Sequence, residues 1–332
     1  MPAPRLRPVA QTLARVRAPH AGLVVGIWRA GQPEAGLWHR GELPAGAGSV
    51  FEIGSVTKVF TATLLADMAR EGLVGIDDPV SRHLPPGVEM PSRGREITLA
   101  DLSSHRSGLP GLARGMLLPG LTTRRADPYA HLDSATLEAA IPRTRPRRPP
   151  EARFRYSNYG VGLLGHLLAR RAGMSYDELV QERICRPLGL RHTGTDVDGG
   201  RLATGHKRRG RPTAHWHLAA LAGAGGLRST ATDVLGFLRL HADCSTSPLA
   251  LAARETRRPR ARVWRLHMGL GWMIAPPGRR IQHELLLHEG GTGGFRSFAC
   301  VAPAANVGVV VLASDTRPVG RLGMRVMRAA LR

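Results

Sequence analysis

Lysine is almost missing from this chain of 332 residues. The formal net charge is +22, yet Lys58 and Lys207 are the only lysines, so arginine supplies nearly all of the positive charge. Aromatic residues make up only 5% of the chain and do not alternate with the arginine clusters, as base-stacking surfaces would require. Zinc-finger, helix-turn-helix and RNA-binding signatures are also missing. We therefore expect no nucleic-acid partner and interpret most of the arginines as solvated surface residues.

Cysteine and long apolar runs are scarce as well. The three cysteines, Cys185, Cys244 and Cys300, are widely spaced and form no CxxC pair, which argues against a disulfide framework. No stretch approaches the roughly 20 apolar residues that a membrane helix needs. Residues 1–20 are basic but lack the apolar core of a secretory signal. The expectation is a protein without membrane association, located in the cytoplasm.

Cofactor and metal motifs are likewise missing. The sequence contains no Walker or dinucleotide-binding glycine pattern between a strand and a helix. His215-Trp216-His217 offers two alternating histidines, but a zinc site needs further ligands that the sequence does not identify. We therefore expect neither a cofactor nor a bound metal.

What the sequence does contain is strand patterns at both ends and helix patterns between them. Short apolar runs bounded by Gly and Pro predict antiparallel strands at 22–29, 36–40, 270–274, 281–288, 295–302 and 307–312. Apolar residues at three- and four-residue spacing, with caps, predict helices at 11–17, 55–70, 98–104, 134–141, 158–172, 176–185, 230–241 and 319–331.

This order predicts an α+β fold in one catalytic domain. An α/β lobe would be built from approximately residues 1–75 and 225–332, and a helical lobe of approximately residues 76–224 would be inserted into it. Residues 108–150 are rich in Gly, Pro and Arg, and we interpret them as a lid-like loop region.

The sharpest chemical signal is Ser55 followed by Lys58. Ser55 stands at the start of a predicted helix, where free backbone N–H groups favour developing negative charge. Lys58, three residues on, lies on the same helix face. An amine beside a hydroxyl in a desolvated cleft assists nucleophilic attack. The pattern S-x-x-K often occurs by chance. Here one of the only two lysines in the chain lies at this offset from a serine, which makes a functional pair a stronger interpretation.

Tyr156-Ser157-Asn158 precedes another predicted helix. A phenol held near a lysine ammonium is expected to have a lowered pKa and to serve as a general base. The amide of Asn158 can orient a substrate amide or ester. The alternative is that Tyr156 belongs to the core and Asn158 caps the helix.

A third segment, His288-Glu289-Gly290-Gly291, ends a predicted strand near the C-terminus. Glycines allow a substrate backbone to approach a strand closely, and an exposed N–H there can donate to an oxyanion. The alternative is an ordinary glycine-rich turn between two strands.

Taken in this order, S-x-x-K, Y-x-N and basic-residue-x-Gly resemble the motifs of the serine β-lactamase and penicillin-binding protein superfamily. The similarity is greatest to its class C-like branch, which holds class C (AmpC-type) β-lactamases, D-aminopeptidase-like peptidases and family VIII esterases. It runs from about Gly22 to Val311 and includes ITLADLSSHRSGLP at 97–110, PLGLRHT at 187–193 and AGGLRSTATD at 224–233.

The resemblance implies the β-lactamase/transpeptidase-like fold, an antiparallel sheet flanked by helices with an inserted helical lobe. It also implies that Ser55 is the acylated nucleophile, that Lys58 and Tyr156 handle its proton, and that Asn158 orients the substrate. The N–H groups of Ser55 and Gly291 would form the oxyanion hole. His288 and Gly290 would replace the Lys and Gly of the K-T-G motif.

His288-Glu289-Gly290 departs from K-T-G because it lacks a permanent cation and a hydroxyl that would hold a β-lactam carboxylate. The expectation is a serine hydrolase acting on a small-molecule or peptidyl acyl substrate with an ester, amide or peptide-type bond. One alternative is an acyltransferase or peptide-cyclising thioesterase, for which the basic surface could dock an acidic carrier protein. Another is a catalytically degenerate binding protein that kept the fold.

Overall fold

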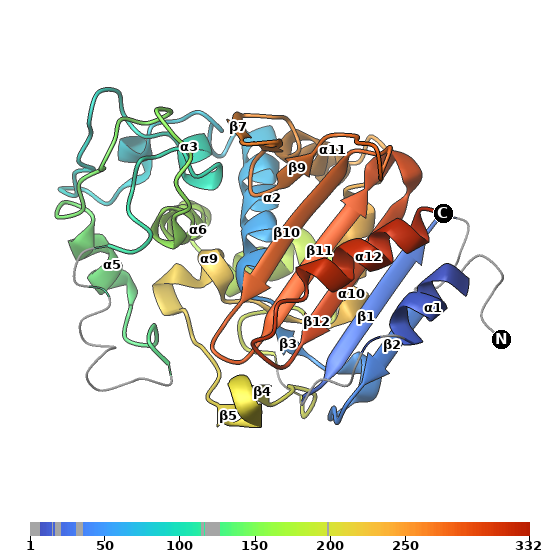
Figure 1. Cartoon of the computed structure of the whole chain (residues 1–332). Coiled ribbons are helices and arrows are strands. Elements are labelled where there is room, and N and C mark those ends of the chain that lie inside the picture. Colours follow the sequence, from blue (N-terminus) through green and yellow to red (C-terminus); the bar gives the residue numbers. More distant parts are fainter. Residues whose placement is uncertain are drawn as a thin grey trace.

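The computed structural model describes residues 7–14, 16, 21–30, 36–113, 116, 127–197 and 199–332. A large sheet occupies one side of the molecule, and helices from the middle of the chain occupy the other (Figure 1). Both ends of the described chain lie on the sheet side (Figure 1). The structure therefore has the predicted α+β fold, with strands from both ends of the chain and helices between them.

The central sheet is antiparallel and has eight strands in the order β2-β1-β12-β11-β10-β9-β8-β7 among the described residues. Its strands are β1 (Leu23–Arg29), β2 (Gly36–Arg40), β7 (Ala261–Val263), β8 (Leu266–Met268), β9 (Met273–Ala275), β10 (Leu285–Gly291), β11 (Arg296–Ala302) and β12 (Val307–Ala313). The N-terminal strand β1 pairs directly with the last strand β12, for example Val25 with Val311. This pairing joins the two ends of the sequence in one sheet.

Helices cover both faces of the sheet. The helices α1 (Arg7–Ala14) and α12 (Gly320–Ala330) lie against each other on one face (Figure 1). The opposite face packs against α10 (Ala231–Leu240), and α2 (Thr57–Arg70) packs beside α11 (Pro248–Thr256). Apolar side chains of β1 alternate accordingly, with Val25 in the core under α12 and Val24 in the larger core on the other side.

The helices of the middle of the chain are α3 (Leu99–Ser103), α5 (Ser134–Ala140), α6 (Asn158–Ala172), α7 (Tyr176–Val180), α8 (Arg186–Leu188) and α9 (Ala222–Gly225). Of these, α3, α6, α7 and α9 pack against α2. The capping signals act as predicted. Thr98 and Asp101 form a reciprocal capping box at α3, and Gly173 ends α6 in the left-handed conformation at φ 68°. Among the described residues, none of the helices has both the length and the apolar character to cross a bilayer.

Two short strand pairings lie outside the central sheet. Strand β3 (Phe51–Glu52) pairs with β6 (Arg228–Ser229), and β4 (Gly205–His206) pairs with β5 (Pro212–Thr213) in a small hairpin. Phe51 and Ile53 are fully buried, which fixes the chain just before Ser55. The nucleophile candidate therefore emerges from a rigid junction between sheet and helices.

Several predicted bounds were wrong. The strand predicted at 281–288 is β10 at Leu285–Gly291. Its last residues have a low strand propensity, and they are part of the strand because they pair with β11. The strand predicted at 270–274 begins only at Met273, after a turn in which Gly271 has φ 70°. The helix predicted at 176–185 continues after α7 as a π-helical turn, Gln181–Cys185.

Other elements went unpredicted or lie partly outside the described residues. The helix α11, capped by Ser247 with Pro248 at its first position, and the short strands β7 and β8 were missed. The helix predicted at 11–17 is α1 at Arg7–Ala14, and residues 15 and 17 lie outside the described part. Of the lid-like region, residues 114–115 and 117–126 are likewise outside it.

Candidate active site

Ser55 lies in a 3₁₀ turn, Gly54–Val56, that leads directly into α2. Gly54 has φ 50°, a conformation that L side chains rarely adopt, and a Cβ there would come within 2.6 Å of the backbone nitrogen of Gly291. A side chain at position 54 would therefore separate Ser55 from β10. The tight turn presents the Ser55 hydroxyl beside the end of that strand.

Lys58 lies one turn further along, completely buried. Its Nζ is 3.0 Å from Ser55 Oγ and 2.8 Å from Asn158 Oδ1, and it also donates to the backbone carbonyl of Ala224. Burial lowers the pKa of Lys58 from 10.5 to about 7, because desolvation disfavours the ammonium. A neutral amine has two N–H donors and one lone pair. Asn158 Oδ1 and the Ala224 carbonyl oxygen only accept hydrogen bonds, so they can take both N–H groups of the amine. The lone pair of Nζ is then left to accept from the Ser55 hydroxyl.

Tyr156 approaches Ser55 from the helical side. Its phenol oxygen donates to Ser55 Oγ at 2.8 Å, and its ring lies over Lys58, with Nζ 4.9 Å from the ring centroid. The expectation of a lowered phenol pKa was wrong. Although 41% of the residue is exposed, burial of the phenol raises the pKa of Tyr156 to about 12, and the hydrogen bond to Ser55 offsets only part of that rise. The phenol therefore carries its proton at neutral pH.

Asn158 is the first residue of α6, but it does not cap that helix. The cap is Ser157, whose hydroxyl accepts from the Gly160 N–H at 2.8 Å. The side chain of Asn158 is thus free to bind Lys58 and to line a small pocket together with Ser55 and Gly291. The alternative of Asn158 as a helix cap is therefore wrong.

His288, Gly290 and Gly291 form the end of β10 beside Ser55. A Cβ on Gly290 would lie 2.1 Å from the Ile53 carbonyl oxygen and 3.0 Å from the Ser55 nitrogen, so only glycine allows the strand to come this close. Because Gly291 lines the same small pocket as Ser55, the strand end and the nucleophile candidate face one space.

The imidazole of His288 is buried and neutral. Burial, followed by the nearby charge of Lys58, lowers the pKa of His288 to about 3. Its Nδ1 lies 2.8 Å from the Glu289 carbonyl oxygen and can donate to it. The carboxylate of Glu289 points to the other face of the sheet, against Gly320 at the start of α12. No cation therefore stands at this position of the motif, as expected from the sequence.

His105 is a residue of this site that the sequence analysis did not single out. It is fully buried, and its ring packs on Tyr156 with centroids 4.3 Å apart. Its carbonyl oxygen accepts from the Arg155 N–H and its Nδ1 accepts from the Ser157 N–H. Burial is the largest cause, followed by repulsion from Lys58 and His288 in their protonated forms, and together they hold the pKa of His105 well below its ordinary value. The sequence signal was weak, since a lone histidine in a loop is usually structural.

Two aromatic residues also border the Ser55 pocket. Tyr129 and Trp216 meet edge to face with ring centroids 5.2 Å apart, and both line it. On either side of Trp216 the histidines are held by acids, His215 by Glu52 and His217 by Asp127, each at 2.9 Å. In the described part of the chain, no three potential ligands come together as a metal site would require.

A serine, a buried lysine and a tyrosine within hydrogen-bond reach, set between an antiparallel sheet and a helical region, define a serine hydrolase of the β-lactamase type. A family model described as Beta-lactamase matches residues 9–331, and the chain belongs to this family. It is a β-lactamase-related hydrolytic enzyme, as the resemblance in its motifs implied.

Curated relatives agree with this assignment. The chain is 28% identical over 289 residues to a D-alanyl-D-alanine-carboxypeptidase/endopeptidase, AmpH, of Escherichia coli (strain K12), covering 80% of this chain and 70% of that protein. It is 26% identical over 308 residues to a β-lactamase of Pseudomonas fluorescens, covering 83% of this chain and 82% of the relative.

Solved structures show the same fold. A class C β-lactamase from Rhodobacter sphaeroides superimposes with a TM-score of 0.80 at 26% identity, covering 98% of both chains. A β-lactamase from Sulfitobacter sp. EE-36 superimposes with a TM-score of 0.81 at 28% identity, covering 99% of this chain and 98% of that one.

Proposed function

We propose that this hydrolase forms a covalent acyl-enzyme at Ser55 and cleaves a peptide-type amide or an ester bond. The observation that carries the proposal is the pair of contacts on Ser55 Oγ, 3.0 Å to Lys58 Nζ and 2.8 Å to Tyr156 Oη. A proton acceptor and a proton donor within reach of the same hydroxyl support its proposed role as an activated nucleophile.

The pKa shifts support one distribution of protons. Lys58, with a pKa of about 7, is substantially neutral at neutral pH and can accept the Ser55 proton as Oγ bonds to the substrate carbonyl carbon. Tyr156, with a pKa of about 12, keeps its proton at neutral pH. It can pass this proton to the leaving group as the bond between the carbonyl carbon and the leaving group breaks. Protonated Lys58 then returns a proton to the phenol oxygen of Tyr156. Water then releases the acyl group by the same steps in reverse.

The end of β10 supports a role in binding the substrate. Strand β9 pairs with β10 only at Leu285–Leu287, so in the described pairings the edge from His288 to Gly291 has no neighbouring strand on that side. An extended acyl chain can add to such an edge. We propose that the N–H groups of Ser55 and Gly291 stabilise the oxyanion and that Asn158 orients the acyl group beside them.

The substrate class follows from the names of the relatives and from His288. The relatives are named for β-lactam and D-alanyl-D-alanine bonds, both of which are amides. A neutral His288 offers no charge to a β-lactam carboxylate, so peptide and ester substrates are proposed over antibiotics. We therefore expect slow turnover of a chromogenic cephalosporin compared with activated esters and short peptides.

The test is hydrolysis of p-nitrophenyl esters by the wild-type protein, by Ser55→Ala and by the exposed-serine control Ser92→Ala. We expect Ser55→Ala to lose at least about a thousandfold in kcat, because the nucleophile is gone, and Ser92→Ala to match the wild type. Equal turnover by Ser55→Ala and the wild type would overturn the proposal.

A further inference from the structure

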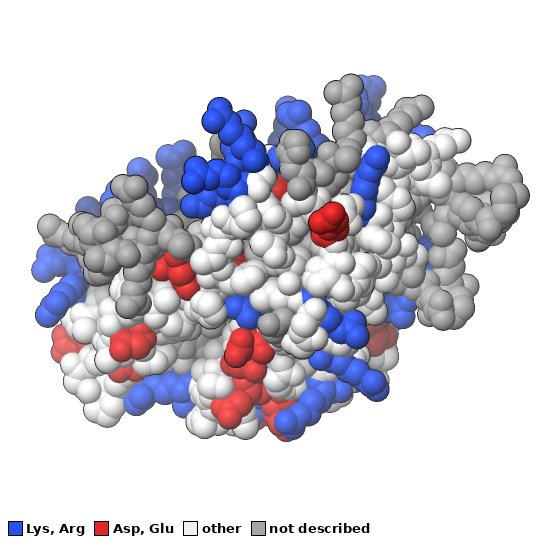
Figure 2. Space-filling view, turned by 90° about the horizontal axis from the view of Figure 1, so that it is seen from below, with Lys and Arg blue, Asp and Glu red and all other residues white. Residues whose placement is uncertain are grey.

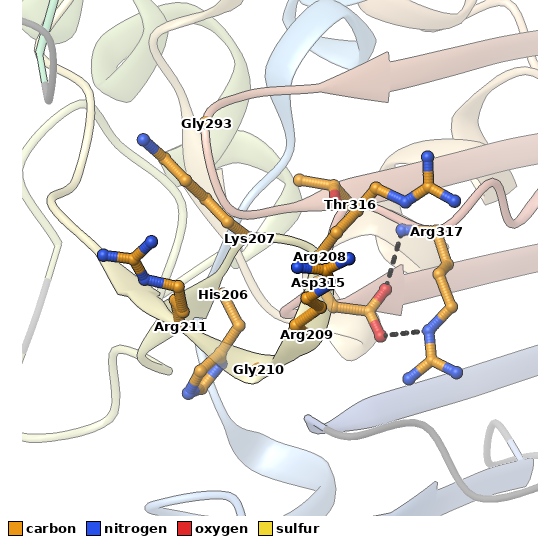
Figure 3. A pocket seen from close by; sticks show the side chains of 10 residues that line it. All are labelled: His206, Lys207, Arg208, Arg209, Gly210, Arg211, Gly293, Asp315, Thr316 and Arg317. Carbon is orange, nitrogen blue, oxygen red and sulfur yellow. Dashed lines mark hydrogen bonds and ion pairs between the residues drawn. The ribbon is translucent and has the colours of Figure 1, made fainter.

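A large basic pocket lies beside the proposed active site. Its volume is about 950 Å³, within the range of small-ligand sites, and it exceeds the pocket at Ser55 itself. Its basic lining residues are His206, Lys207, Arg208, Arg209, Arg211 and Arg317. Figure 3 shows Lys207 and Arg211 on one side of it and Arg317 on the other. On the face seen in Figure 2, basic side chains lie in several groups with acidic side chains between some of them rather than in one continuous patch.

Most of the positive charge in this pocket is not neutralised. Asp315 is the one acidic residue in the described lining, and it already pairs with Arg317 at 2.9 Å (Figure 3). In the described part of the chain, Lys207, Arg208, Arg209 and Arg211 form no ion pair. Four like charges on one short loop repel each other, and a bound anion would relieve that repulsion.

The loop that carries these cations is anchored. It joins β4 to β5, and the His206 N–H donates both to the Gly294 carbonyl oxygen at 3.2 Å and to the Ser314 carbonyl oxygen at 2.9 Å. A Cβ on Gly294 would meet the Gly205 backbone at 2.7 Å, so the loop and the β10–β11 turn pack closely. The backbone at the start of this loop is therefore held beside the β10–β11 turn, and the cation side chains that follow it are exposed to solvent.

The linings of the basic pocket and of the Ser55 pocket are adjacent in the sequence. Gly291 and Thr292 line the pocket at Ser55, and Gly293 lines the basic pocket. Gly291 and Gly293 are two residues apart, so their Cα atoms are separated by at most about 7 Å. A peptide that pairs with the free edge of β10 would therefore reach the cations two or three residues from the reacting carbonyl.

We propose that this basic pocket binds acidic side chains of a peptidyl substrate, two or three residues from the bond that is cleaved. The inference rests on the proposed acyl-enzyme function and adds the substrate class. Arginine guanidinium groups bind carboxylates in a bidentate geometry, and the free strand edge selects an extended peptide as the bearer of those carboxylates.

The experiment uses matched peptides that carry glutamate or glutamine on either side of an internal scissile bond. Wild-type protein should cleave at least one glutamate peptide with a kcat/KM about tenfold above that of its glutamine counterpart, mainly through KM. Arg208→Gln/Arg211→Gln should lose this preference and keep turnover of a neutral ester. The control Arg279→Gln/Arg280→Gln removes two exposed arginines from the loop before β10 and should keep the preference for the glutamate peptide.

Binding to Ser55→Ala, measured by calorimetry, tests the pocket without catalysis. The acidic peptide should bind more tightly than its neutral counterpart, and Arg208→Gln/Arg211→Gln should abolish the difference. Equal binding of the two peptides would overturn the inference while leaving ester hydrolysis by Ser55 intact. Acidic-peptide binding without turnover of any peptide or ester by the wild-type protein would instead contradict the proposed function and the assignment of the pocket to substrate. Faster turnover of an acyl group on an acidic carrier protein, without a peptide preference, would assign the surface to a protein partner and also overturn the inference.

Discussion

The imidazole of His105 packs on the phenol ring of Tyr156, with centroids 4.3 Å apart and ring planes at 37°. The same residue accepts hydrogen bonds from the N–H groups of Arg155 and Ser157, the two neighbours of Tyr156. His105 thus holds the tyrosine from its backbone on both sides and from its ring. Because Tyr156 donates to Ser55 at 2.8 Å, a shift of this segment changes the geometry at the nucleophile.

We predict that His105 is a positioning residue for Tyr156. His105→Ala should lower kcat for a neutral ester about ten- to a hundredfold, since small misplacements of reacting groups have effects of that size. His105 has φ 58°, which alanine tolerates poorly and asparagine tolerates well. His105→Asn, whose side-chain oxygen can accept from the Ser157 N–H, should therefore recover part of the activity.

His241 provides the matched control, because it is also fully buried but its ring packs on Phe237 and Trp272 rather than on Tyr156. His241→Asn should lower the melting temperature and leave kcat of the folded protein unchanged. A His105→Ala protein with wild-type kcat would show that His105 only supports the fold.

The pH dependence of activity should follow Lys58. Its amine must be neutral to accept the Ser55 proton, and burial lowers its pKa to about 7. Hence kcat/KM for a neutral ester should rise about tenfold per pH unit below 7 and level off above it. Tyr156, with a pKa of about 12, should produce no second transition below about pH 10.

The two buried histidines near Lys58 should not appear in this profile. Their pKa values are lowered, to about 3 for His288 and well below the ordinary value for His105, so both stay neutral across the physiological range. Lys58→Arg should abolish the activity at every pH, because a guanidinium cannot lose its proton in this range. A flat profile between pH 5 and 9 in the wild-type protein would exclude Lys58 as the proton acceptor.

Close approach of β10 to Ser55 should depend on Gly290. In Gly290→Ala the new methyl would lie 2.1 Å from the Ile53 carbonyl oxygen, so the strand must move away from the nucleophile. We expect a loss of kcat of about a hundredfold or more, the size of effect seen when an oxyanion donor is removed. Ester kinetics together with a circular dichroism melt would separate the loss of activity from a loss of folding.

Gly291→Ala is the comparison variant. Its methyl would meet the flexible end of the Arg296 side chain at 2.6 Å, and the backbone N–H is retained. We expect a much smaller loss than in Gly290→Ala. Equal losses in the two variants would indicate that the glycines serve the turn rather than the approach to Ser55.

The sequence predicted best where local chemistry decides the structure. The helix at 158–172 has the predicted bounds, because Ser157 caps its start and Gly173 ends it. The pairing of Ser55 with Lys58 was likewise predictable from a three-residue offset on one helix face. Both depend on neighbours within a few residues.

Prediction from the sequence failed where contacts between distant parts of the chain determine the surroundings of a residue. The pKa of Tyr156 was expected to fall beside Lys58, but burial of both groups, which no local pattern reveals, raises it and leaves the amine substantially neutral. His105 belongs to the site only through its contacts with residues 155–157, which are distant from it in the sequence. The basic residues at 207–211 were expected to be solvated, and their side chains are exposed. The cavity beside them was not predictable from the sequence, because it forms where the β4–β5 hairpin docks on Gly294 and Ser314.

Intact-mass spectrometry tests the central claim most directly. Wild-type protein exposed to an activated ester or a fluorophosphonate should gain one adduct, located by peptide mapping on Ser55, and Ser55→Ala should gain none. An adduct on another residue, or an unmodified Ser55 in protein that still hydrolyses the ester, would contradict the account.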